Sequence, residues 1–286
     1  MASPESAGAA SGARYRIQPT VKVGIGLIVI YAIVLAVIQQ TSGVEYDEFV
    51  DSAENAWKAP VLSLGVGAVL LLAFMAWARW DMIWRDPERL PMPRMAWVLL
   101  GAFVATMVVR LVGIRYGDID RELLLAVLCL GVLVGLTEEL LFRGFFLRCM
   151  RGAGLSEGMA AVWTALAFGL FHLPNVFLGT GVSGLGQVVL AGLSGAALYF
   201  FRRAFGLIVV AMVVHGLFDV GTFLEPDYAP DSIGNTAFVL NFIAYVLAAG
   251  SFFYLIRNNR NFKVTPAGIV PMPEQQPRAE PSPEQG

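Results

Sequence analysis

The stretch that decides the fold spans residues 123–147 and reads LLLAVLCLGVLVGLTEELLFRGFFL. A helix rises about 1.5 Å per residue, so about 20 apolar residues cross the hydrocarbon core of a bilayer. This run is longer than that, and its only charged residues are Glu138, Glu139 and Arg143. It therefore predicts a transmembrane helix that carries ionisable side chains inside the membrane.

Seven further apolar runs accompany this one. Together they predict spans at about 23–41, 60–79, 95–113, 123–147, 157–178, 185–201, 204–223 and 236–256. The 286 residues are 57% hydrophobic and 15% charged, with a mean hydropathy of +0.65, whereas soluble domains carry about 25% charged residues. We therefore expect the all-α fold class, as a polytopic bundle of about eight transmembrane helices.

The basic residues indicate an orientation. They gather before span one, between spans two and three, and after spans four, six and eight, while the alternate loops are acidic or neutral. One loop, residues 114–121, mixes Arg115 and Arg121 with Asp118 and Asp120. The positive-inside pattern places both termini in the cytoplasm, and we expect a multi-pass protein of the bacterial cytoplasmic (inner) membrane.

The remaining composition narrows the function. A net charge of −2 argues against a nucleic-acid partner. Cys129 and Cys149 lack a CxxC spacing and are interpreted as small buried residues. Residues 1–22 and the proline-rich residues 265–286 are expected to be disordered tails.

The charged residues within span four point to function. A charge at the bilayer centre costs about 2.5–3.5 kcal/mol, so such side chains usually face the bundle interior. Glu139 and Arg143 are four residues apart and can pair on one helix face. Glu138 points about 100° away, which leaves it without a local partner and makes it a candidate general base. The alternative is an ion-pair network that only holds helices together.

Both histidines of the chain also lie within predicted spans. His172 follows Phe168 by one helical turn, and Phe168 is interpreted as a packing residue that keeps the pocket dry. His215 and Asp219 share a helix face, so Asp219 can orient the imidazole. Each histidine taken alone has an equally good structural explanation, as a satisfied hydrogen-bonding group.

Three polar faces on three spans can converge only in the bundle interior. Two chemistries then stay open. Glu138 can act as the base for a water molecule, or Zn²⁺ can be held by His172, His215 and a carboxylate such as Glu138. The cofactor is therefore left undecided between Zn²⁺ and none.

The motifs EExxxR at Glu138–Arg143, FxxxH at Phe168–His172 and HxxxD at His215–Asp219, in this order, resemble the CPBP family of intramembrane proteases. This group includes the type II CAAX prenyl (Rce1-like), bacteriocin-processing and myxosortase-type proteases. The resemblance covers roughly residues 120–225 as a protease core, between N-terminal helices in 23–119 and a last helix in 226–264.

The resemblance implies roles for the motif residues. Glu138 would activate water together with His172, Glu139 and Arg143 would support it, and His215 with the residue four later would stabilise the oxyanion. Asp219 stands where the eukaryotic CAAX proteases often have Asn. Because an ionised Asp repels an oxyanion, Asp219 must be protonated, pair with His215 or bind a metal.

The function expected from the resemblance is an intramembrane glutamate- or metallo-endopeptidase that cleaves a membrane-associated or lipidated protein or peptide. The substrate is expected to enter from the cytoplasmic side or laterally. The alternative is a non-enzymatic membrane protein, either a proton or ion relay transporter or an immunity or scaffold protein. The expected partners are the lipid bilayer and the substrate, with no nucleic acid.

Overall fold

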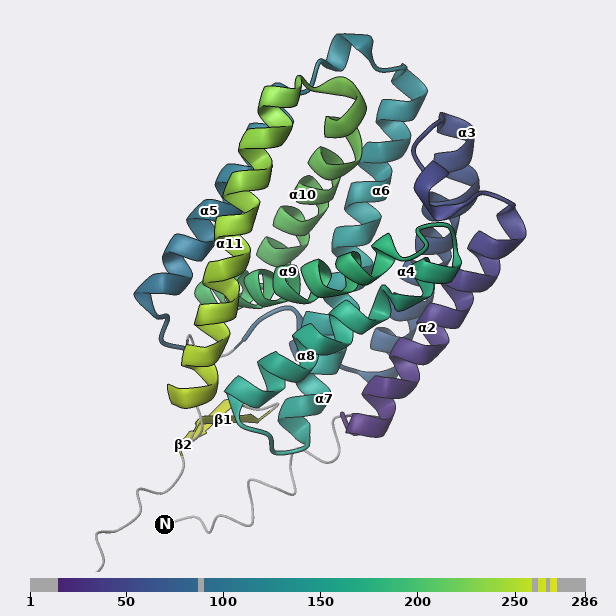
Figure 1. The fold of residues 1–286 in the computed structure, drawn as a ribbon. Coiled ribbons are helices and arrows are strands. Elements are labelled where there is room, and N and C mark those ends of the chain that lie inside the picture. Colours follow the sequence, from purple (N-terminus) through teal and green to yellow (C-terminus); the bar gives the residue numbers. More distant parts are fainter. Residues whose placement is uncertain (1–14, 87–89, 259–261, 266–267, 272–286) are drawn as a thin grey trace, which may run out of the picture.

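The structure is a computed structural model that describes residues 15–86, 90–258, 262–265 and 268–271. Within these residues, eight helices are long and apolar enough to cross a membrane, as predicted (Figure 1). The spans are built from the following elements: α2 (Val21–Ser42); α3 (Ala53–Ala56), η2 (Trp57–Val61) and α4 (Leu62–Ala78); α5 (Arg94–Gly113); α6 (Arg121–Glu139), η5 (Leu140–Phe146) and α7 (Leu147–Gly152); α8 (Glu157–Phe171) and η6 (Leu173–Phe177); α9 (Ser183–Phe205); α10 (Ile208–Tyr228); and α11 (Asp231–Asn258).

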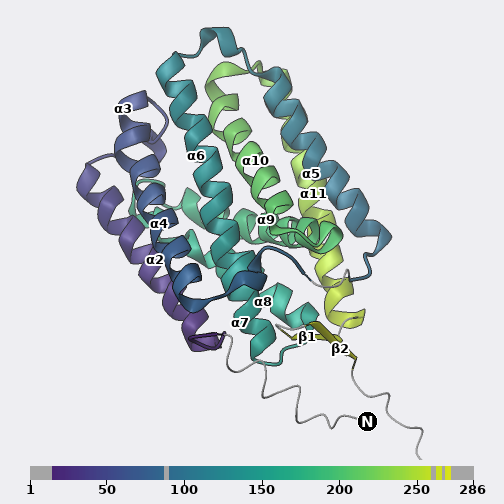
Figure 2. The same ribbon diagram turned by 180° about the vertical axis from the view of Figure 1, so that it is seen from behind.

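The helices are not all parallel. Figures 1 and 2 show α6, α10, α5 and α11 running along the long axis of the bundle, whereas α9 crosses it. The short turns η1 (Tyr46–Glu48) and η4 (Tyr116–Asp118) lie in connections at one end, and η3 (Asp81–Ile83) lies in the connection between α4 and α5. Apolar side chains exposed on the outer helix faces form the surface expected to contact lipid.

The fourth span begins and continues for clear local reasons. Asp120 starts α6, because its Oδ1 accepts hydrogen bonds from the backbone N–H groups of Glu122 and Leu123. After Glu139 the helix widens into the π-helix η5, which holds Arg143. Such π-helical segments are frequent at functional sites.

Glycines allow α6 and α10 to pack at close range. A Cβ atom at Gly135 would overlap the carbonyl oxygen of Met212, and one at Gly216 would overlap the carbonyl oxygen of Gly131. The missing side chains therefore let the two backbones touch, as small residues do between membrane helices. This contact brings His215, next to Gly216, against the glutamates of α6.

The short connection from α9 to α10 is the tight turn that the spacing of the spans requires. Gly206 adopts φ 66°, in the left-handed region, and its N–H donates to the carbonyl of Arg202 at 2.7 Å. Glycine adopts this conformation without the steric penalty of a Cβ atom.

Arginines that were expected only to orient the chain are buried in the structure. Arg151 bonds both Asp86, at 2.8 Å, and Glu157, at 2.7 Å, and Arg202 bonds Asp86 at 2.9 Å. Burial alone would raise the pKa of Asp86, but the guanidinium groups of Arg202 and Arg151 hold it well below its usual range. This network ties the α4–α5 connection to α7, α8 and α9.

The expected tails differ in part from the structure. Residues 1–14, 266–267 and 272–286 lie outside the described residues. Within the predicted N-terminal tail, the Ile17 carbonyl accepts a hydrogen bond from Trp80 Nε1, and Thr20 caps α2. The predicted C-terminal tail begins at the end of β1 (Phe262–Thr265), which pairs antiparallel with β2 (Gly268–Pro271) inside that tail, because β-branched residues there favour extended backbone.

Candidate active site

Glu139 joins two helices at the centre of the bundle. Its Oε1 accepts hydrogen bonds from Arg143 Nη1 at 2.7 Å and from His215 Nδ1 at 2.9 Å. The side chains of Glu139 and Arg143 are fully buried. The Glu139–Arg143 pair has the spacing that the sequence predicts, but the bond to His215 was not foreseen, since it joins residues 76 positions apart.

Phe168 does more than exclude water. Its ring lies 4.3 Å from the guanidinium carbon of Arg143, in a cation–π contact, and its centroid is 5.1 Å and 5.7 Å from those of His172 and His215. Gly195 provides the room for this arrangement, because a Cβ atom there would approach Arg143 Nη2 and Phe168 to 3.0 Å. One aromatic side chain thus packs against three of the predicted site residues.

Glu138 faces away from this pair, as the helical geometry predicts. It is 8% exposed, and its Oε2 has no hydrogen-bond partner among the described residues. The nearest basic atom in an ion-pair contact is His215 Nε2, at 3.9 Å. Glu138 therefore contributes to the site a buried carboxylate oxygen without a hydrogen-bond partner among the described residues.

The hydrogen bonds of the histidines define their free atoms. Nδ1 of His172 lies 2.9 Å from the carbonyl oxygen of Phe168, which can only accept, so Nδ1 carries the proton. Nε2 of a neutral His172 is then a lone pair. In His215 an ionised Glu139 likewise requires the proton on Nδ1.

Asp219 lies one turn beyond His215, with Oδ2 at 3.7 Å from Nε2. Its side chain is 22% exposed, and therefore more accessible than that of Glu138. The predicted i, i+4 relation is present, although the distance exceeds that of a direct hydrogen bond. Asp219 thus contacts the face of His215 that Glu138 also approaches.

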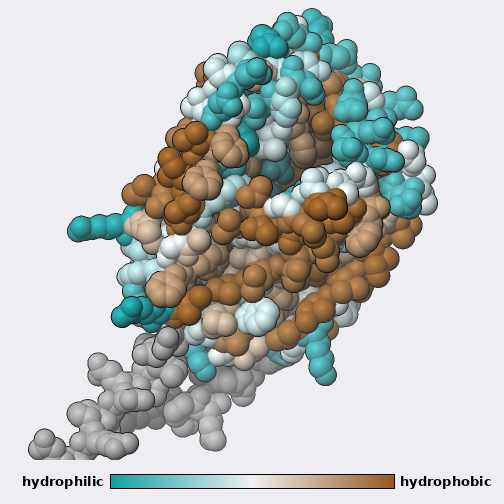
Figure 3. Space-filling view, viewed as in Figure 1, coloured by the Kyte–Doolittle hydropathy of each residue, from teal (hydrophilic) through white to brown (hydrophobic). Residues whose placement is uncertain are grey.

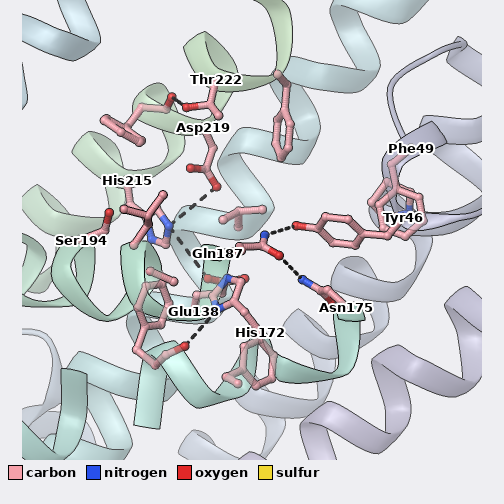
Figure 4. A pocket seen from close by; sticks show the side chains of 18 of the residues that line it. Tyr46, Phe49, Glu138, His172, Asn175, Gln187, Ser194, His215, Asp219 and Thr222 are labelled. Carbon is pink, nitrogen blue, oxygen red and sulfur yellow. Dashed lines mark hydrogen bonds and ion pairs between the residues drawn. The ribbon is translucent and has the colours of Figure 1, made fainter. Parts of the chain in front are cut away.

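One cavity of about 610 Å³ collects the predicted residues. Glu138, His172, His215 and Asp219 all line it, and Figure 4 shows their side chains pointing toward a common space. Glu139 and Arg143 lie behind this wall rather than in it. The arrangement brings an acceptor oxygen, an imidazole lone pair and a second imidazole to one water-accessible site inside the bundle.

A second set of polar side chains in the cavity was missed from the sequence. Gln187 Nε2 donates to the hydroxyl oxygen of Tyr46 at 2.7 Å, and Asn175 Nδ2 donates to Gln187 Oε1 at 3.0 Å (Figure 4). Burial raises the pKa of Tyr46 to about 12, so its hydroxyl keeps the proton. Polar residues within apolar spans, Gln187 above all, were the signal that could have revealed this chain of hydrogen bonds.

A zinc ion would need a cluster of donor side chains at this site. The described part of the chain contains no group of three or more His, Cys, Asp or Glu side chains that could hold a metal ion. A structural or catalytic zinc site needs at least three such ligands at about 2.0–2.3 Å from the metal. As placed among the described residues, Glu138, His172 and His215 do not form such a ligand set.

Comparison with known proteins adds one result. Residues 120–221 match the family model described as Type II CAAX prenyl endopeptidase Rce1-like. The match begins at the cap of α6 and ends within α10, so it contains all three motifs. This segment is therefore similar to the Rce1-like family. No curated protein and no solved structure gives a significant match.

The match confirms the resemblance that the three motifs indicate. The Rce1-like family implies a protease, here within an integral, multi-pass membrane protein. The matched segment supplies Glu138, His172, His215 and Asp219, whereas α2, η1, α5 and α11 lie outside the match and supply other walls of the cavity. The bilayer and a protein substrate are accordingly its partners in general terms.

Proposed function

We propose that the protein is an intramembrane endopeptidase in which Glu138 and His172 activate water to cleave a membrane-associated or lipidated protein or peptide. One observation carries the proposal: the free Oε2 of Glu138 and the free Nε2 of His172 belong to the same cavity. Both groups can accept a proton, as water activation requires. The family match supports the same reaction class.

The reaction follows from these groups. Glu138 takes a proton from a water molecule, and the oxygen of that water attacks the carbonyl carbon of the peptide bond. Nε2 of His172 accepts a hydrogen bond from the second O–H group of the same water. The C–N bond of the tetrahedral intermediate then breaks, and the leaving amine takes the proton that Glu138 received. Enclosure within the bundle supplies the orientation of the water.

His215 is the donor in reach for the developing oxyanion. Its Nδ1–H is donated to Glu139, so the doubly protonated ring carries its second proton on Nε2, facing the cavity. Asp219, at 3.7 Å from Nε2, favours the protonated ring electrostatically. This assigns Asp219 to positioning His215 rather than to direct contact with the oxyanion, which accounts for Asp in place of Asn.

The test is hydrolysis of internally quenched peptides with an apolar segment, prepared with and without an S-farnesyl cysteine, by purified protein in detergent. Glu138→Gln and His172→Ala should each lower kcat by about 10²–10⁴-fold. Glu48→Gln, the same change on an exposed glutamate outside the cavity, is the matched control and should keep the wild-type kcat.

A zinc chelator distinguishes the two mechanisms left open by the sequence. The donor spacing predicts that 1,10-phenanthroline leaves the rate of hydrolysis unchanged. Full activity in Glu138→Gln would refute the assignment of the base. Loss of activity on chelation, restored by added Zn²⁺, would refute the metal-independent mechanism.

A further inference from the structure

Among the described residues, the connections that line the cavity all lie at one end of the bundle. Its outer lining comes from the α2–α3 connection (Tyr46, Asp47 and Phe49), from Leu178 in the α8–α9 connection, and from Thr222 near the end of α10. None of the described residues at the opposite end, where α2 begins, α4 ends and α11 ends, lines the cavity. Figure 1 places these two sets of connections at opposite ends of the molecule.

The two ends carry opposite charge. The described residues at the cavity end include eleven acidic and four basic side chains: Glu45, Asp47, Glu48, Asp51, Glu54, Asp118, Asp120, Glu122, Glu225, Asp227 and Asp231, against Lys58, Arg110, Arg115 and Arg121. The described residues at the other end include three acidic and eleven basic ones: Asp81, Asp86 and Glu157, against Arg16, Lys22, Arg79, Arg85, Arg94, Arg148, Arg151, Arg202, Arg203, Arg257 and Lys263. Figure 3 shows hydrophilic residues gathered over the upper, acidic end and hydrophobic ones over α2, α8 and α9 below.

Carboxylate side chains continue from the rim into the cavity, where they outnumber the single positive charge that His215 carries when its ring is protonated. Asp47 and Asp219 line it together with Glu138, whose Oε2 is buried and unpartnered among the described residues. The one arginine of the lining, Arg110, is already bound to Glu225 at 3.3 Å and to Thr222 at 2.6 Å. A cavity with walls of low dielectric constant concentrates the field of such charges and attracts cations.

We propose that the cavity receives its substrate from the acidic end, as a peptide segment with lysine or arginine beside the bond to be cleaved. The positive-inside pattern puts the basic end in the cytoplasm. The acidic end, and with it the entrance of the cavity (its mouth), therefore faces the opposite side of the membrane. This reverses the cytoplasmic entry expected from the sequence. That the substrate is cleaved rests on the proposed function. The side of the membrane on which the mouth lies, and its negative charge, do not depend on that function.

Thiol labelling tests the side of the mouth without requiring catalysis. Cys129 and Cys149 are replaced by alanine, and a single cysteine is introduced by Ser194→Cys in the cavity wall or by Lys22→Cys at the basic end. Right-side-out vesicles then receive membrane-impermeant methanethiosulfonates. We expect Ser194→Cys to react in intact vesicles and Lys22→Cys only in permeabilised ones; the reverse pattern would overturn the proposal.

The sign of the reagent tests the charge. A trimethylammonium reagent should modify Ser194→Cys at least about tenfold faster than a sulfonate reagent of similar size, each rate normalised to a free thiol. Adding Asp47→Asn should lower this ratio, and high salt should lower it further, because screening shortens the Debye length to about 3 Å at 1 M. Asp81→Asn, the same change at the basic end, is the matched control and should leave the ratio unchanged. Equal normalised rates for the two reagents would refute the cation preference.

Peptide hydrolysis tests whether the site prefers a substrate with lysine or arginine beside the bond to be cleaved. Quenched peptides that share one apolar segment are flanked by Lys-Lys or by Glu-Glu, and kcat/KM is compared at low salt. The Lys-Lys peptide should be cleaved at least about tenfold more efficiently, with a smaller ratio in Asp47→Asn. Equal values for both peptides would refute this preference. If neither peptide is cleaved while labelling behaves as expected, the proposed function fails and the cation-attracting mouth stands.

Discussion

Substitution Glu139→Gln removes the negative charge that two helices share. Glu139 is fully buried, and its Oε1 accepts from Arg143 at 2.7 Å and from His215 at 2.9 Å. Glutamine keeps the shape of the side chain, but one neutral oxygen cannot balance a buried guanidinium. Among the described residues, Arg143 would keep the Phe168 ring as a cation–π contact but lose its carboxylate partner.

The magnitude follows from the distance. Opposite unit charges 2.7 Å apart attract by about 6 kcal/mol at an effective dielectric constant of 20. Removing one partner of a buried pair usually destabilises a protein by about 3–5 kcal/mol. We expect Glu139→Gln to lower the free energy of unfolding by that amount, measured by SDS titration in mixed micelles and followed by the fluorescence of the six tryptophans.

A double-mutant cycle separates the charge from the packing. Arg143→Met alone leaves the Glu139 carboxylate buried with His215, and should also destabilise strongly. The double variant removes both charges and should lose about 1–2 kcal/mol, less than either single variant. Glu48→Gln is the exposed control and should stay within about 0.5 kcal/mol of wild type. A wild-type unfolding curve for Glu139→Gln, or additive losses in the double variant, would refute the reasoning.

Two further predictions concern packing and pH. Gly135→Ala should lower the free energy of unfolding by about 1–3 kcal/mol, because the new methyl group overlaps the Met212 carbonyl, whereas Gly101→Ala, with open space around it, should not destabilise in the same titration. The pKa of Asp86 is lower in the folded protein than its usual value, so its contribution to stability is present above about pH 4 and declines as pH falls below that. The difference in Tm between wild type and Asp86→Asn should therefore be large at pH 7 and shrink toward pH 3; a difference independent of pH would contradict the role of the ion pairs with Arg202.

Much of the candidate site follows from local spacing. The i, i+4 relation puts Glu139 beside Arg143 and His215 beside Asp219, and the same geometry turns Glu138 away from its neighbour. Burial of charge in a membrane helix then requires that these faces meet in the interior. The structure has this convergence, with Glu138, His172, His215 and Asp219 around one cavity.

Other features of the site could not be read from spacing. The Tyr46–Gln187 hydrogen bond joins residues 141 positions apart, and the Glu139–His215 bond joins residues 76 apart. Which helix faces which neighbour depends on backbone contact, such as that of Gly135 with Met212, and on the crossing direction of α9. The arginines of the basic end show the same limit, because Arg151 and Arg202 are buried ion-pair partners of Asp86.

The sequence by itself determined the eight spans, the residues in them that carry chemistry and the polarity of the connections. These properties depend on the hydrophobicity of single segments and on the helical period, which are local quantities. Only the tertiary structure decided which side chains complete the site, why Arg143 and Phe168 stack, and at which end the cavity opens. Those depend on how helices distant in the chain pack, because a cavity is the space that several packed helices leave between them.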